Sequence, residues 1–500
     1  MTSEHDSATP VASGGSHHGE SPSEAPEGGL NQRPVAAEQD SAATGSAGGS
    51  SGFSRRGVLI AGGTAGVGAA AGLGVAAAQR SGLLGAAGSS DREDSGTATE
   101  PARTEAVGAR SEAFYGPRQA GIDTMPQSFA TFLAVDQAEG TERETIRRMM
   151  RVLTQDAAAL TGGDAPINDQ EPELALNPSR LTVTFGFGAR ILNLVAPERA
   201  PEWLRPLPAF GIDQLEDRWN DGDLLIQVCC EDTVSLAHAQ RVLLKNLRSF
   251  GTVRWVQNGF RSVPGAEAAD PPSMRNLFGQ VDGTVDTQPD TPEHEQIVWG
   301  VGEQAFQPWI QDGTSLVLRR IHMNLDTWDE ADRPAREDSV GRTLDTGAPL
   351  TGTAERDEPD FEAVGPLGFK IIPDYSHIRR SRHPDDRVRI HRRPYNYDVP
   401  VMDASGFASA GSSSGGVSDS GLLFASYQAD VDQQFVPIQQ RLDDLDMLNV
   451  WTVPVGSAVF AIPPGCQKGG FVGDVLFNDD DAARDVDARD GQTADAEGGA

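Results

Sequence analysis

The sequence predicts an α+β fold in which helices cover one face of antiparallel sheets, arranged as two similar modules. Apolar runs bounded by turn residues predict the strands, and apolar residues spaced three and four apart predict the helices. The first half holds strand patterns at residues 128–135, 180–187, 223–230 and 252–257, and helix patterns at 141–160 and 233–250. This βαβ-like order is typical of a ferredoxin-like module.

The second half of the folded region repeats the mixture of strands and helices. Strand patterns occur at residues 315–325, 387–395, 421–427 and 457–462, and a helix pattern occurs at 431–445. A proline-rich stretch at 264–272 separates the halves, and residues 326–366 and 404–420 are predicted surface loops. We therefore expect two ferredoxin-like modules with antiparallel sheets, at residues 112–266 and 267–478.

The two ends of the chain lack the apolar side chains that a folded core needs. Residues 1–53 are mostly Ser, Gly, Ala, Glu and Pro, and residues 79–111 have a similar composition. Such segments bury too little surface to offset the entropy of ordering. We expect a disordered extension at 1–53, a linker at 79–111 and an acidic disordered tail at 479–500.

The overall charge excludes one large class of partner. The chain of 500 residues carries a formal net charge of −32. Nucleic-acid binding depends on basic surface, so we expect no nucleic-acid partner.

A twin-arginine pair precedes a weakly apolar stretch near the start of the chain. Arg55 and Arg56 open a Gly- and Ala-rich run that ends at residues 76–78 in an A-x-A pattern. The segment 54–78 resembles a twin-arginine export signal, which predicts a periplasmic, cell-surface or extracellular protein. The run is also long enough to cross a bilayer, so a retained signal would act as an anchor.

One acidic turn, one histidine and an arginine pair form the strongest chemical pattern. Residues 278–284 read FGQVDGT, and the flanking glycines let the backbone at Asp282 approach a flat cofactor. His377 follows in the segment SHIR, and Arg392 and Arg393 lie beyond it. A carboxylate, an imidazole and a guanidinium suit haem peroxide chemistry. Taken alone, Asp282 is equally suited to bond its own turn.

The ordered set of motifs resembles the dye-decolourising (DyP-type) haem peroxidases. Residues 274–284 look like their G-x-x-D-G motif and residues 374–379 like their proximal-histidine segment. The likeness continues through three further segments, at residues 313–320, 347–350 and 421–428. It is closest to the exported branch linked to bacterial ferrous-iron uptake, the deferrochelatases. The resemblance implies ferredoxin-like modules of the dimeric α+β barrel superfamily.

The resemblance assigns roles to residues on both faces of a haem. His377 is the implied axial ligand of the haem iron. Asp430 matches the family's carboxylate partner of that histidine, although it also suits a helix N-cap before residue 431. On the open face, Asp282 would move a proton between the peroxide oxygens and Arg392 would stabilise O–O cleavage. Arg393 is the rival, because adjacent strand residues point to opposite faces.

Other residues would complete the haem pocket. Gly283, Thr284 and Val285 would line the haem edge and Arg342 would meet a propionate. Leu422 and Phe424 alternate along a strand and would form an apolar distal wall, a pattern that ordinary core residues share.

These expectations define a haem peroxidase that uses H2O2 to oxidise organic donors such as dyes or phenols through compound I. The chain has no C-x-x-C-H motif among its three cysteines, so we expect one non-covalent haem b per chain. Two alternatives remain: release of iron from haem as in deferrochelatases, and haem binding or delivery without turnover. Haem or porphyrin as substrate, iron-uptake proteins and a second copy of the chain are the further partners implied.

Overall fold

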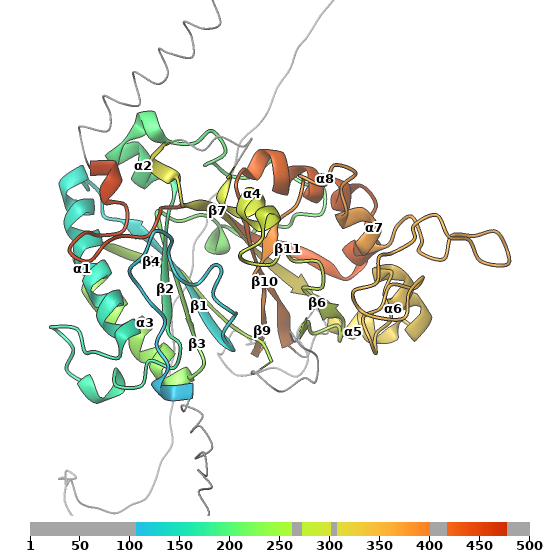
Figure 1. Ribbon diagram of the computed structural model, residues 1–500, viewed down its shortest axis with the longest axis horizontal. Coiled ribbons are helices and arrows are strands. Elements are labelled where there is room, and N and C mark those ends of the chain that lie inside the picture. Colours follow the sequence, from blue (N-terminus) through green and yellow to red (C-terminus); the bar gives the residue numbers. More distant parts are fainter. Residues whose placement is uncertain (1–106, 263–272, 302–307, 401–417, 478–500) are drawn as a thin grey trace, which may run out of the picture. The chain divides into compact units, whose positions relative to one another are not determined.

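The computed structural model describes residues 107–262, 273–301, 308–400 and 418–477 (Figure 1). The predicted extension at 1–53, the twin-arginine segment at 54–78 and the acidic tail at 479–500 lie outside these residues, as do most of the linker and the boundary at 266/267. In the part of the chain that the structure describes, no helix is long and apolar enough to cross a membrane.

The first module has the strand and helix order that the sequence predicts. Its strands are β1 (Phe129–Gln137), β2 (Thr182–Phe187), β3 (Leu224–Cys230) and β4 (Gly251–Phe260), and its main helices are α1 (Arg143–Gly162), α2 (Ala189–Val195) and α3 (Thr233–Leu247). The strands pair antiparallel in the order β2-β3-β1-β4. This is the ferredoxin-like arrangement, with the first strand between the third and the fourth.

The second module repeats that strand order with β7 (Thr314–Met323), β9 (Tyr395–Pro400), β10 (Ser418–Gln428) and β11 (Thr452–Ile462). They pair as β11-β7-β10-β9, and the short strand β8 (His391–Arg392) adds to β10. A two-stranded sheet of β5 (Met274–Arg275) and β6 (Val281–Asp282) lies outside this set. The predicted α+β class and ferredoxin-like modules are confirmed.

The two sheets join at both edges into one closed ring of strands. The joints are single residue pairs, Ala461 with Phe187 between β11 and β2, and Phe260 with Asn396 between β4 and β9. The interior holds a buried cluster that includes Phe132, Tyr395 and Tyr427. The ring therefore leaves each sheet an outer face to be covered by other elements.

Helices cover the outer faces (Figure 1). α1 and α3 pack side by side on the first sheet over a large apolar core. The second module carries α4 (Pro292–Trp299), α5 (Leu325–Glu330), α6 (Arg333–Val340), α7 (His377–Ser381) and α8 (Val436–Leu445), the last preceded by a π-helical turn at Val431–Phe435. A smaller cluster around Trp328 and Leu422 lies among α5, α6 and β10.

Two predictions about secondary structure are wrong in detail. The segment 326–366, predicted as loop, contains most of α5 and all of α6. The strand predicted at 387–395 is reduced to His391–Arg392, and β9 starts only at Tyr395, because Pro394 has no N–H to continue a ladder. The predicted loop at 404–420 lies outside the described residues up to 417, and residues 418–420 begin β10.

Candidate active site

His377 opens the short helix α7 and keeps one nitrogen free. Its Nδ1 lies 2.6 Å from Oδ2 of Asp446, whose side chain is 3% exposed. The ring itself retains 33% of its exposed surface. Among the described residues no hydrogen bond to its Nε2 is present. A ring held by Nδ1 with Nε2 open is arranged to coordinate a metal.

The partner of His377 is Asp446, and Asp430 takes the other of its two predicted roles, the helix N-cap. Asp430 caps the helical turn that follows it, accepting the backbone N–H of Gln433 at 3.0 Å. The intervening helix, ending at Leu445, places Asp446 rather than Asp430 next to α7. Asp446 is itself an N-cap through the backbone N–H of Leu448, 3.0 Å away, so its carboxylate is fixed before it meets the imidazole.

Three charged residues influence the pKa of His377. Burial lowers the pKa of His377, but the charge and the hydrogen bond of Asp446 outweigh this effect and the net pKa is raised. Arg392 lowers the pKa of His377 and Asp282 raises it, by smaller amounts. Charges act most strongly on near neighbours, so the structure brings the predicted axial ligand and the two predicted catalytic residues into one region.

Arg392 is held between two carboxylates. Its Nη1 lies 2.9 Å from Oδ1 of Asp282, and its Nε lies 3.0 Å from Oδ1 of Asp286. The backbone N–H of Arg392 also donates to Asp286, at 3.3 Å. Burial lowers the pKa of Arg392, but Asp286 and Asp282 outweigh it and raise the pKa. The guanidinium is therefore a fixed positive charge with 19% of its surface still exposed.

Arg393 turns away from this group. It is fully buried, and its guanidinium donates to the carbonyl of Thr124 and to Oε1 of Gln127. Arg392 ends β8 and Arg393 follows it, with its backbone N–H donating to the carbonyl of Ala425 at 2.8 Å, so the alternation of side chains in extended chain separates the two arginines. Of the pair, only Arg392 contacts Asp282.

The turn that carries Asp282 depends on glycine. Gly279 and Gly283 have φ angles of 79° and 102°, in the region that residues with a Cβ seldom adopt. A Cβ on Gly283 would lie 3.3 Å from Oδ2 of Asp286. The glycine thus lets the chain fold back so that Asp282 and Asp286 reach the same guanidinium. Sequence analysis did not identify Asp286, although its spacing of four from Asp282 was a signal.

The residues predicted at the haem edge differ in their surroundings. Thr284 is buried and donates to Oε1 of Glu355 at 2.9 Å, whereas Val285 is 58% exposed. Arg342 is buried, and its Nη1 donates to the carbonyls of Gly347 at 2.7 Å and Glu355 at 2.8 Å. Burial lowers the pKa of Arg342; the charge of Glu355 opposes this in part, and the positive charge of Arg392 lowers the pKa by a smaller amount.

Leu422 and Phe424 point to the outer face of β10. Leu423 and Ala425, between and after them, belong to the buried interior of the ring. Leu422 packs in the cluster with Trp328, and Phe424 lies 6.4 Å from the ring of Phe435. The pair therefore forms an apolar wall on the sheet face outside the ring.

These residues fit a haem. His377 offers an unbonded nitrogen, Leu422 and Phe424 offer apolar surface, and Arg342 and Arg392 offer positive charge for carboxylates or peroxide. The fit rests on chemistry of three kinds, a metal donor, an apolar wall and buried cations, in one region of the second module.

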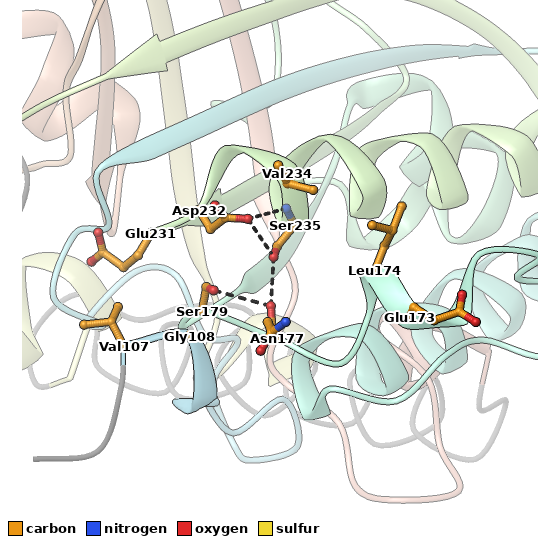
Figure 2. A pocket seen from close by; sticks show the side chains of 10 residues that line it. All are labelled: Val107, Gly108, Glu173, Leu174, Asn177, Ser179, Glu231, Asp232, Val234 and Ser235. Atoms are coloured by element: carbon orange, nitrogen blue, oxygen red, sulfur yellow. Dashed lines mark hydrogen bonds between the residues drawn. The ribbon is translucent and has the colours of Figure 1, made fainter. Parts of the chain in front are cut away.

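A surface pocket lies away from the candidate site (Figure 2). It has a volume of about 500 Å³ and is lined by residues at the start of α3, including Asp232 and Ser235. The Asp232 carboxylate accepts the backbone N–H of Ser235 at 2.8 Å, and the Ser235 hydroxyl donates to the carbonyl of Asn177 at 2.8 Å. None of the candidate residues lines this pocket, and Asn177, Ser179, Asp232 and Ser235 bond one another within it.

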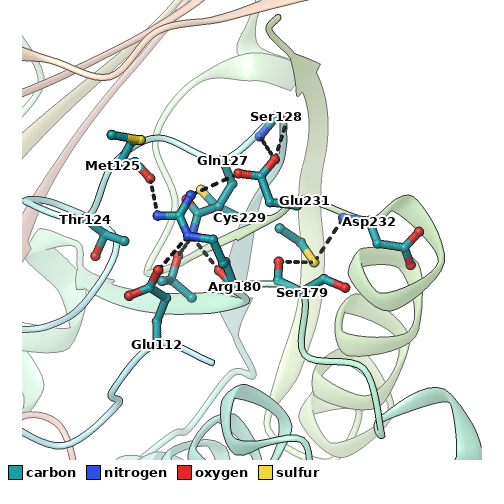
Figure 3. Close-up of polar contacts among 12 residues, drawn as sticks. Glu112, Thr124, Met125, Gln127, Ser128, Ser179, Arg180, Cys229, Glu231 and Asp232 are labelled. Carbon is teal, nitrogen blue, oxygen red and sulfur yellow. Dashed lines mark hydrogen bonds and ion pairs between the residues drawn. The ribbon is translucent and has the colours of Figure 1, made fainter. Parts of the chain in front are cut away.

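The cysteines lie away from the candidate site. Cys229, Cys230 and Cys466 are free and buried. Burial raises the pKa of Cys230 to about 12. Figure 3 shows the polar contacts around this region, where Arg180 bonds Glu112 at 2.8 Å and Glu231 at 3.0 Å. This half-buried arginine ties the start of the described chain to the residue that follows β3.

The comparisons with known proteins agree with the site. Residues 119–261 match the N-terminal domain and residues 273–467 the C-terminal domain of the Dyp-type peroxidase family. The dye-decolorizing peroxidase of Thermobifida fusca is 34% identical over 445 residues, covering 85% of this chain and 97% of that protein. The deferrochelatase of Escherichia coli K12 is 30% identical over 392 residues, 74% of this chain and 87% of that protein.

Solved structures show the same relationship. The DyP-type peroxidase of Cellulomonas bogoriensis is 49% identical, with a TM-score of 0.69, and covers 74% of this chain and 99% of its own. That of Streptomyces coelicolor is 36% identical, with a TM-score of 0.67, and covers 73% and 97%. Fold and site define a haem-dependent oxidoreductase of the peroxidase class. The chain belongs to the Dyp-type peroxidase family.

Proposed function

We propose that this haem peroxidase holds one non-covalent haem b through His377 and uses Arg392 and Asp282 to activate H2O2 for the oxidation of organic donors. The single observation that carries the proposal is the Arg392 guanidinium, held by Asp282 and Asp286 in a region whose charges act on His377. Haem, when bound, supplies the iron that receives the oxidising equivalents of peroxide.

On the peroxide side, the chain supplies a proton acceptor and a positive charge. Asp282 takes the proton from one peroxide oxygen and returns it to the other, so that the second oxygen leaves as water. Arg392 stabilises the negative charge that develops as the O–O bond breaks. Leu422 and Phe424 limit the water that competes for the same space.

On the other side, Asp446 fixes the imidazole. Its carboxylate at 2.6 Å from Nδ1 keeps a proton on that nitrogen, which leaves Nε2 as the donor to iron and makes it a stronger one. The pKa of the buried Arg342 is lowered despite the charge of Glu355, so a further anionic neighbour would stabilise its charge, and a haem propionate is such a group.

A second function is favoured by the 30% identity to deferrochelatases. As a proposal for this chain, iron would leave haem with the porphyrin intact. Two assays on the haem-loaded protein separate the functions. Oxidation of an organic donor by H2O2 without chelated iron supports the first. Free porphyrin with chelated iron, after incubation with an added reductant and a ferrous-iron chelator, supports the second, because the reductant gives ferrous iron and two protons replace it on the porphyrin nitrogens.

Export by the twin-arginine route completes the proposal. It is supported by Arg55 and Arg56 ahead of an apolar run with an A-x-A end. The protein would act in the periplasm, at the cell surface or outside the cell, and a retained signal would anchor it there.

The direct test of the proposed peroxidase uses the purified, haem-loaded protein with H2O2 and a phenolic donor. Turnover should require His377, and His377→Ala should lose most bound haem or shift its absorption to a water-ligated form. Unchanged haem content and an unchanged Soret band in this variant would move the axial role to another residue.

A further inference from the structure

A second histidine lies buried beside the candidate site without belonging to it. His294 sits in the first turns of α4, with a side chain that is 0% exposed. Its Nε2 lies 2.8 Å from Oδ1 of Asp123, and its Nδ1 lies 2.9 Å from Oγ1 of Thr287. Its ring meets the ring of His391 edge-on, with the centroids 4.9 Å apart. Both nitrogens and one face of this imidazole are therefore occupied.

The contacts of His294 converge on the pair that holds the guanidinium. Thr287 directly follows Asp286, and His391 directly precedes Arg392. Asp286 and Arg392 are more than a hundred positions apart in the chain and bond each other at 3.0 Å. His294 thus contacts both neighbours of this pair, one through a hydrogen bond and one through its ring.

The same helix connects the two segments a second time. Glu293, next to His294, forms an ion pair with Arg389, and Nη2 of Arg389 donates to the carbonyl of Val285 at 2.9 Å. Gln434 adds a third link, donating to the carbonyls of Arg389 at 2.9 Å and Ile297 at 3.0 Å. Glu293 and His294, at the start of α4, therefore hold the turn at Asp286 and the strand at Arg392 together.

This support matters because few backbone bonds hold Arg392. β8 consists of two residues, paired with Ser426 and Tyr427 of β10, and the backbone N–H of Arg393 adds one bond to the carbonyl of Ala425 at 2.8 Å before Pro394 ends the pairing. A displacement of a fraction of an ångström matters for a group that must meet a developing charge.

We propose that His294 is a positioning residue for Arg392: it sets the place of the guanidinium through Thr287 on one side and His391 on the other. The inference rests on the proposed function, in which Arg392 acts at the open face of the haem. Asp123 orients the imidazole by accepting from Nε2, which leaves Nδ1 to accept the hydroxyl proton of Thr287. His294 itself touches neither peroxide nor the reacting atoms.

Fluoride binding to the ferric, haem-loaded protein tests this placement without turnover. Fluoride is a small anion that binds ferric haem at its open face, and a positioned guanidinium there strengthens binding by a charge-assisted hydrogen bond. Arg392→Leu gives the reference effect. Loss of the guanidinium should weaken fluoride binding roughly tenfold to a hundredfold, as expected for a hydrogen bond to a charged group. The measurement is the absorbance change on titration with sodium fluoride.

Three variants test the contacts of His294. His294→Gln reaches toward Asp123 but loses Thr287 and the ring contact, so it should weaken fluoride binding by a substantial part of the Arg392→Leu effect. His294→Asn can place its amide near the position of Nδ1 and should restore part of that loss. Thr287→Val removes only the hydroxyl and should weaken fluoride binding in the same direction. It also serves as the test if the His294 variants fail to fold.

The matched control is His238→Gln. His238 in α3 is likewise buried, with its Nε2 2.8 Å from Oδ2 of Asp169, but it belongs to the first module. It should lower thermal stability without changing fluoride affinity. Parent-like fluoride affinity in folded His294→Gln and Thr287→Val, beside a weakened Arg392→Leu, would overturn the inference alone. Unchanged affinity in Arg392→Leu would overturn the proposed role of Arg392 as well.

Discussion

Nδ1 of His377 lies 2.6 Å from Oδ2 of Asp446, a carboxylate that is already fixed as a helix cap. The carboxylate makes the imidazole a stronger donor, which stabilises ferric over ferrous iron. Asp446→Asn should therefore raise the reduction potential of the bound haem. Spectroelectrochemical titration measures it.

Asp430→Asn is the control for that experiment. Asp430 caps the turn before α8 and makes no contact with His377 among the bonds of the described residues. It should leave the potential unchanged. A shift in Asp430→Asn together with a parent-like Asp446→Asn would reverse the assignment of the axial partner.

Substitutions of Arg392 and Arg393 should affect different properties, reactivity with H2O2 and stability respectively. Arg393→Leu leaves the Thr124 carbonyl and the Gln127 side chain without a buried donor, so it should lower the free energy of unfolding by about 1–3 kcal/mol. It should keep most of its reactivity with H2O2, because its guanidinium faces away from Asp282. Denaturant unfolding and peroxide kinetics on the same samples check both statements, and a stable but unreactive Arg393→Leu would contradict them.

Stability should depend on pH through Asp156. Burial raises the pKa of Asp156 in the folded protein, and a hydrogen bond from Asn246 opposes this only in part. A raised folded pKa gives stability that is complete below the unfolded value of about 3.9 and is lost as pH rises through the folded value. Asp156→Asn should therefore be more stable than the parent at pH 7.5, and the gain should shrink as pH falls toward 4.

Asp385→Asn serves as a comparison, because the pKa of Asp385 is shifted in the opposite direction. Hydrogen bonds from the side chain and backbone of Arg387 lower the pKa of Asp385 to about 2. Its contribution is present above the unfolded pKa and lost as pH falls, so Asp385→Asn should show no gain at pH 7.5. Urea unfolding at several pH values follows both variants, and equal behaviour of the two would refute the burial argument.

Export should require the arginine pair. Replacing Arg55 and Arg56 with lysine keeps the charge but removes the paired guanidinium groups that the twin-arginine route recognises. We expect the double variant to stay in the cytoplasm, which cell fractionation detects. Normal extracytoplasmic accumulation of the variant would show that residues 57–78 act as a different signal or as an anchor.

Strong local patterns made much of the fold predictable. The apolar run at 223–230 predicted β3 to within a residue, and the pattern from Thr233 predicted the start of α3. α5 and α6 were missed because their segment is highly polar and few of their residues are buried. The closed ring of strands depends on two single-residue joints that no local pattern marks, and only the resemblance to the barrel superfamily indicated it.

The site was predictable where chemistry and turn geometry coincide. Asp282 and Arg392 were identified, and the structure joins them at 2.9 Å. Asp446 was missed because its distance from His377 depends on how α8 packs against α7, a tertiary contact. His294 was missed for the same reason: its partners Asp123 and His391 come from remote segments.

The most direct test of the account is the stopped-flow absorption spectrum after mixing the haem-loaded protein with one equivalent of H2O2, for the parent and for Arg392→Leu. The account predicts that the parent haem spectrum changes rapidly. Arg392→Leu should hold the same amount of haem and respond about 10²–10³-fold more slowly, the usual cost of losing one positioned donor. Equal rates in the two proteins, at equal haem content, would contradict it.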